Sequence, residues 1–181
     1  LFGMVHLACD SPSSFEANCY YLYSSAIVKY NMERGSFLAL KWRLEMSIPK
    51  EIKLHAEKNA RLRFIRDQIY IWEISSNEEM IGLAYLDNVK GKSQPITFVV
   101  FFDSNGRVLK SHIVKYREPI GGEVANHHWL KPFFGKSWES DYQVGIDIDG
   151  ISGATISVNA VTRGIHRSTF IVDYLLKQEH E

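Results

Sequence analysis

Four consecutive stretches of the chain carry the hydrophobic pattern of β-strands. Residues 69–74 are rich in β-branched and aromatic side chains, and residues 80–89 resume this pattern after the polar stretch 75–79. Residues 96–102 form a continuous apolar run, as in a strand that is central in its sheet. Residues 108–116 alternate once more between apolar and polar positions. Short turns separate these stretches, so the sequence predicts an antiparallel meander.

The segments between and before these strands contain turn and helix signals. Asn105-Gly106 predicts a hairpin turn, because this pair supplies positive φ angles at low cost. Ser47, with Pro49 just inside, predicts the start of a helix that runs to about residue 63. Residues 126–134 predict a short helix. Residues 37–46 have mixed helical and strand character, and residues 1–30 give no assignable pattern.

The last segment predicts a long amphipathic helix from about residue 154 to residue 176. Its apolar residues recur at helical spacing, which indicates one buried face: Val158, Val161, Ile165, Val172 and Leu175. Gly164 costs about 1 kcal/mol relative to alanine in a helix, and we interpret it as a close contact with the sheet. The whole pattern predicts an α+β fold in which helices pack on an antiparallel sheet.

The composition is that of an ordinary globular protein. The chain has 181 residues, of which 45% are hydrophobic, enough for one domain with a sizeable core. Lys+Arg and Asp+Glu both number 21. This balance argues against a nucleic-acid partner, because proteins that bind nucleic acid usually carry an excess of basic residues. The sequence contains no run of eighteen apolar residues, so no membrane span is expected. The aromatic content of 13% suits either a filled core or stacking on a planar ring.

The first residues leave several alternatives open. The segment 1–9 has the character of the end of a signal peptide, and Cys9 after Ala8 resembles a lipoprotein cleavage site, although His6 departs from that pattern. Cys9 and Cys19 could form a disulfide. Neither belongs to a CxxC motif or a Cys/His cluster, so a structural zinc site is not expected.

The most informative motif opens the final helix: Asp149-Gly-Ile-Ser-Gly-Ala-Thr155. A helix N-terminus has unpaired N–H groups and partial positive charge, which suit a phosphate. Gly153 lets the backbone approach an anion closely, and Thr155 places a hydroxyl beside it. The alternative is a simple helix cap, for which Ser152 is a good N-cap residue.

This motif resembles the flavinylation motif of the FMN-binding domain family, which includes the C and G subunits of sodium-pumping and Rnf-type respiratory complexes. The resemblance extends from about Trp42 to Leu176 and is strongest from Tyr116 to Arg167. It implies that a flavin transferase joins FMN to Thr155 through a phosphoester bond. It also implies that Ser152, Gly153 and Ala154 contribute to the cofactor site. Residues 37–181 would then form the domain, preceded by an N-terminal segment 1–36.

The resemblance extends to residues outside the motif. Asp149 is implied as the acid that the transferase recognises, with an Asx turn as the alternative and Asp147 equally close. Arg117-Glu-Pro-Ile-Gly-Gly-Glu123 resembles a family turn, which would bring backbone N–H groups and a carboxylate against the flavin. The residues implied there are Glu118, Gly121, Gly122 and Glu123. Isoleucine at position 120 replaces an arginine that is frequent in this branch. The alternative is a loop that simply ends the sheet.

Two further side chains are candidates for contact with the flavin. Trp129, or one of the nearby phenylalanines Phe133 and Phe134, would stack on the ring. Lys136 would pair with the phosphate or with the reduced flavin, or would be a solvated surface lysine. The adjacent histidines 127 and 128 are weak metal candidates, because no third ligand accompanies them.

These observations lead to a functional hypothesis with two alternatives. The chain is expected to carry covalent FMN and to transfer electrons rather than act as a stand-alone catalyst. Its expected partners are a flavin transferase and a membrane electron-transfer protein, in the periplasm or on the outer face of the cytoplasmic membrane. One alternative is an FMN-dependent reductase of a soluble substrate. The other is a binding or assembly module that keeps the fold without the cofactor.

Overall fold

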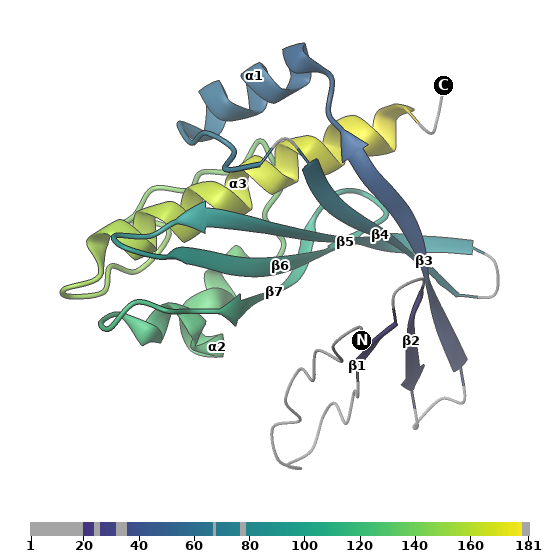
Figure 1. Cartoon of the computed structure of the whole chain (residues 1–181), viewed down its shortest axis with the longest axis horizontal. Helices are drawn as coiled ribbons and strands as arrows, with labels where there is room; N and C mark the ends of the chain where they lie inside the picture. Colours follow the sequence, from purple (N-terminus) through teal and green to yellow (C-terminus); the bar gives the residue numbers. More distant parts are fainter. Residues whose placement is uncertain (1–19, 24–25, 32–35, 67, 77–78, 179–181) are drawn as a thin grey trace.

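The computed structural model describes residues 20–23, 26–31, 36–66, 68–76 and 79–178. Its centre is one antiparallel sheet of seven described strands, whose spatial order follows the chain from β1 to β7 (Figure 1). The strands are β1 Tyr20–Tyr23, β2 Ala26–Asn31, β3 Ser36–Ser47, β4 Gln68–Ser76, β5 Glu79–Lys90, β6 Pro95–Asp103 and β7 Val108–Lys115. The antiparallel meander expected from the sequence is confirmed.

Two long helices lie together on one face of the sheet. The C-terminal helix α3, Thr155–Gln178, packs across β5 and β6, and α1, Lys50–Ala60, packs beside it (Figure 1). The chain between β7 and α3 contains three short helical turns: η1 Gly122–Ala125, α2 His127–Leu130 and η2 Lys131–Phe133. The α+β class is therefore also confirmed.

The core lies between α3 and the sheet. All five apolar residues that define the predicted helix face are buried: Val158, Val161, Ile165, Val172 and Leu175. They meet inward-facing strand residues such as Tyr85, Phe98 and Phe102, which are fully buried. Burial of apolar surface of this kind is the main favourable term in folding. The helix also approaches β5 and β6 closely at Gly164, where an added Cβ would lie 2.6 Å from Val89 Cγ1.

A buried ion pair joins α3 to the sheet. Arg167 Nη2 donates to Asp87 Oδ2 at 2.6 Å, and Tyr85 donates to the same oxygen at 2.9 Å. The Arg167 guanidinium stacks on the ring of Phe64, 3.8 Å from its centroid. Both charged side chains are almost completely excluded from water, so each one offsets the desolvation cost of the other.

Several expected boundaries need correction. Ser47 does not start a helix, because it is the last residue of β3, and α1 begins at Lys50 with Pro49 at its N-cap position. The helix ends at residue 60 rather than 63, where Arg61 takes the left-handed conformation. Residues 37–46 are strand, and the unassigned first 30 residues contribute two strands. The Asn105-Gly106 turn is confirmed, with positive φ at the glycine alone.

The interpretations that concern residues 1–19 lie outside the described residues. These are the signal-peptide and lipoprotein alternatives and the disulfide between Cys9 and Cys19. The division into segments 1–36 and 37–181 stays a prediction. Within the part of the chain that the structure describes, no helix is long and apolar enough to cross a membrane.

Candidate functional site

Thr155 is the first residue of α3 and is exposed to solvent. Its hydroxyl has no hydrogen-bond partner among the described residues. The Ala154 carbonyl accepts the first helical bond, from Val158 N at 2.9 Å, so Ala154 occupies the N-cap position. The expectation that Ser152 caps the helix is therefore wrong, because Ser152 lies two residues too early. The N–H groups of the first turn of α3 remain without intrahelical acceptors.

A pocket of about 310 Å³ surrounds this helix start. Three segments that are distant in sequence line it. They are residues 92–93 in the turn between β5 and β6, residues 118–120 after β7, and residues 153–157 at the start of α3. The pocket is therefore assembled by the fold, and of the expected site residues it contains Glu118, Gly153, Ala154 and Thr155.

Glu118 fixes the turn between β5 and β6. Its Oε1 accepts hydrogen bonds from Ser93 N at 2.6 Å and from Gln94 N at 3.0 Å. The backbone bonds from Gln94 and Ser93 favour the charged form and lower the pKa of this carboxyl. Gly91 leaves room for the approach, since a Cβ there would lie 2.5 Å from Oε1. Glu118 thus places residues 92 and 93 on the pocket rim.

Gly121 lets the loop after β7 lie against the helix start. Its φ is +88°, and an added Cβ would lie 2.3 Å from the Cβ of Ala154. Only glycine satisfies both conditions. The Tyr116 hydroxyl donates to the Ile120 carbonyl and lies 3.1 Å from Ser157 Oγ. These contacts hold residues 118–120 beside α3.

The rim of the pocket combines one cation with exposed apolar side chains. Lys92 is exposed and lines the pocket together with Thr155. Ile120 and Ile156 are 64% and 52% exposed, and both line the same pocket. Isolated exposed isoleucines need no explanation, but two of them beside an unpaired hydroxyl and an ammonium group suit a ligand with a phosphate and an apolar ring.

The remaining candidates lie outside the lining of this pocket. Trp129 is buried, its Nε1 donates to the Asp149 carbonyl at 2.8 Å, and its ring packs edge-on against Phe133. This bond holds the loop that precedes α3. Asp149 is exposed to solvent. The Asp147 carboxylate accepts a hydrogen bond from Gln143 N at 2.8 Å.

Lys136 and the end of the 117–123 turn, Gly122 and Glu123, also lie outside the lining of the pocket at Thr155. The Lys136 ammonium donates to the Asp141 carbonyl at 2.6 Å and lies 5.3 Å from the ring centroid of Tyr142. Gly122 and Glu123 are exposed in η1, and Ser152 is exposed before the helix. Phe134 is exposed and lines a different pocket, described below.

Sequence reasoning missed Lys92 and Ser93. The only available signal was a basic residue in the polar stretch between two strands, Gly91-Lys-Ser-Gln94. Its position relative to Thr155 depends on the pairing of β5 with β6, in which Lys90 lies opposite Pro95, and on the packing of α3. Neither can be read from sequence spacing.

Comparison with protein families now adds an independent observation. The family model of the FMN-binding domain matches residues 91–169. This part of the chain is therefore similar to the FMN-binding domain family. Every residue that lines the pocket at Thr155 falls within the matched range. A search of curated proteins finds no match to the chain.

The FMN-binding domain therefore spans the structural elements that build this pocket. It begins at the turn that carries Lys92, continues through β6, β7 and the 117–123 loop, and ends within α3. Among the described residues, no group of three His, Cys, Asp or Glu side chains is arranged to hold a metal ion.

Proposed function

We propose that this protein carries FMN covalently, through a phosphoester between Thr155 and the cofactor phosphate. The observation that carries the proposal is the exposed, unpartnered hydroxyl of Thr155 at the first turn of a 24-residue helix, inside a pocket of an FMN-binding domain. The helix N-terminus favours a phosphate there, and Lys92 adds a formal positive charge on the rim.

The apolar part of the rim supports the same assignment. An isoalloxazine ring is planar, with π faces and an apolar dimethylbenzene edge, and Ile120 and Ile156 expose apolar surface beside the attachment point. Ile120 would then offer the ring van der Waals contact. FMN itself supplies the redox chemistry, because it accepts and releases electrons in one- or two-electron steps.

The chain lacks an evident base for its own modification within the described pocket. Glu118 is the only carboxylate among the described lining residues, and its lowered pKa makes it a weak base. One of its oxygens already accepts two backbone hydrogen bonds. Attachment requires that Thr155 Oγ1 lose its proton while the phosphorus of the flavin donor loses its leaving group. These properties support a separate flavin transferase that supplies the base.

We further propose that the flavoprotein is an electron carrier outside the cytoplasm, working with a membrane electron-transfer protein. A covalent bond retains the cofactor where free FMN is scarce. The pocket leaves the apolar rim open to solvent, which suits exchange of electrons with a partner. Fractionation of the native host, followed by detection of the bound flavin, tests this location. Recovery of all the flavoprotein in the cytosol would contradict it.

Co-expression with a flavin transferase tests the attachment. The purified protein is denatured in SDS and its flavin fluorescence is recorded in the gel. We expect fluorescence in the wild type, none in Thr155→Ala, and partial or full recovery in Thr155→Ser, which keeps a hydroxyl. Fluorescence that persists in Thr155→Ala would contradict the assignment. A colourless wild type would instead favour a cofactor-free module, and rapid turnover of a soluble substrate would favour a reductase.

A further inference from the structure

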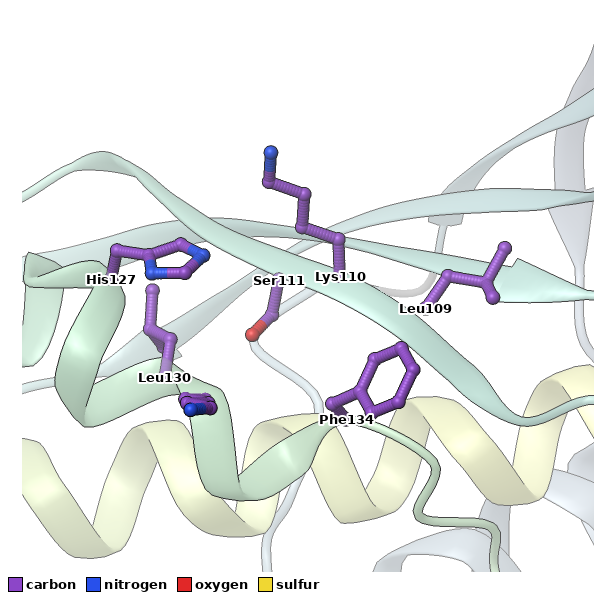
Figure 2. Close-up of a pocket in the computed structure, with 7 residues that line it drawn as sticks. Leu109, Lys110, Ser111, His127, Leu130 and Phe134 are labelled. Atoms are coloured by element: carbon purple, nitrogen blue, oxygen red, sulfur yellow. The ribbon is translucent and has the colours of Figure 1, made fainter. Parts of the chain in front are cut away.

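A second pocket lies between β7 and the short helices α2 and η2 (Figure 2). Its volume is about 440 Å³, within the range of small-molecule sites. Leu109, Leu130 and Phe134 provide apolar walls. Leu109 and Phe134 are 46% and 67% exposed, so these walls are open to a ligand. No residue of this pocket lines the pocket at Thr155.

The inner end of this α2–β7 pocket contains a buried hydroxyl. Ser111 is only 4% exposed, and its Oγ has no hydrogen-bond partner within the described structure. Its oxygen points from β7 toward the α2–η2 segment (Figure 2). A buried polar group without a partner is costly, and such groups are rare in folded proteins. A ligand oxygen at this position would complete the missing hydrogen bond.

The outer end of the pocket is basic. His127 and Lys131 are exposed and line it, and its described lining contains no carboxylate. Lys131 forms no ion pair with a described residue. Lys110 also lines the pocket, but its ammonium group points away from α2 (Figure 2). Because acidic and basic residues are equal in number over the whole chain, this local excess of basic groups indicates an anionic ligand.

We infer that the α2–β7 pocket binds a small planar hydroxyaryl carboxylate. The aromatic ring lies between Leu109, Leu130 and Phe134. The carboxylate pairs with Lys131 and His127 at the open end, and the hydroxyl at the opposite end of the ring meets Ser111. The pocket offers a buried hydroxyl, apolar walls and exposed basic side chains, and this class of molecule carries one group that suits each of them. The site is independent of FMN attachment at Thr155.

Three naphthalene probes separate the contributions of the two ends. The complete ligand is 6-hydroxy-2-naphthoate, 2-naphthoate lacks the hydroxyl, and 2-naphthol lacks the carboxylate. Each is titrated into the full-length protein, and binding is followed by amide chemical shifts. We expect saturable shifts at residues 109–111 and 127–134 with the complete ligand. Each incomplete probe should bind about tenfold more weakly, because each lacks the group that makes one of the polar contacts.

Variants assign these losses to particular side chains. In Ser111→Ala the two naphthoates should bind equally, and in Lys131→Gln the complete ligand should lose about tenfold. Lys115→Gln, an exposed lysine on the same strand outside the pocket, is the matched control and should change nothing. Thr155→Ala should bind like the wild type. Absence of saturable binding, shifts centred on residues 153–157, or affinities unaffected by both pocket variants would overturn the inference. Thermal unfolding of each variant confirms that it is folded.

Discussion

Replacing Gly164 by alanine should destabilise the protein, although the same change stabilises most exposed helix positions. Alanine gains about 1 kcal/mol in helix propensity relative to glycine. Its Cβ, however, would lie 2.6 Å from Val89 Cγ1 and 3.0 Å from two ring atoms of Phe98. Val89 and Phe98 are 1% and 0% exposed, so they have little space into which to move. Overpacking of this kind typically costs about 1–3 kcal/mol. The clash should therefore exceed the gain.

A double-mutant cycle isolates the clash from the propensity gain. Because Val89 and Phe98 are buried, we expect a clash in the upper part of that range, about 2–3 kcal/mol, so Gly164→Ala should lower the free energy of unfolding by about 1–2 kcal/mol after the propensity gain. Val89→Ala alone should cost on the order of 1–2.5 kcal/mol through the cavity that it leaves. The double variant should be more stable than the sum of the two effects by about 1 kcal/mol or more, because the smaller side chain makes room. Urea unfolding followed by circular dichroism gives all four values. A stabilised Gly164→Ala variant, or strictly additive effects, would refute the packing argument.

Three further predictions follow from the site and the core. Asp87→Ala should lower the free energy of unfolding by about 3–5 kcal/mol, because it leaves the buried Arg167 guanidinium unpaired. Urea unfolding measures this loss, and a loss below about 1 kcal/mol would contradict the prediction. The lowered pKa of Glu118 means that its bonds to the 91–94 turn stabilise the fold above its ordinary pKa of 4.5 and weaken as pH falls below that value. The amide shifts of Ser93 and Gln94 should titrate in that acidic range in the wild type and not in Glu118→Gln. Lys92→Ala should slow flavinylation several-fold in a time course with the transferase, while Lys115→Ala should proceed at the wild-type rate.

The sheet and the last helix could be predicted because their signals are local. The apolar run 96–102 and the turn at Gly106 specify a strand and its exit without reference to the rest of the chain. The buried face of α3 follows from its 3.6-residue period. The prediction that Ser47 starts a helix was wrong because a serine two residues before a proline is also compatible with the end of a strand. In the structure, pairing of β3 with β4 extends to that residue, opposite Gln68.

The pocket at Thr155 could be predicted only in part. The motif placed Gly153, Ala154 and Thr155 at a helix start, because backbone geometry and residue type act within a few positions. Lys92 is brought there by a hairpin and by helix packing over more than sixty residues, which no local pattern encodes. Trp129 has an aromatic ring suited to stacking on a flavin, but in the structure its indole N–H serves the loop before α3.

Peptide mass spectrometry tests the central claim most directly. Trypsin should release residues 137–163 as one peptide, since Lys136 and Arg163 flank a stretch without lysine or arginine. After co-expression with a flavin transferase, this peptide should carry the mass of FMN less one water, and fragmentation should place the addition on Thr155. An unmodified peptide, or an addition on Ser152 or Ser157, would contradict the account.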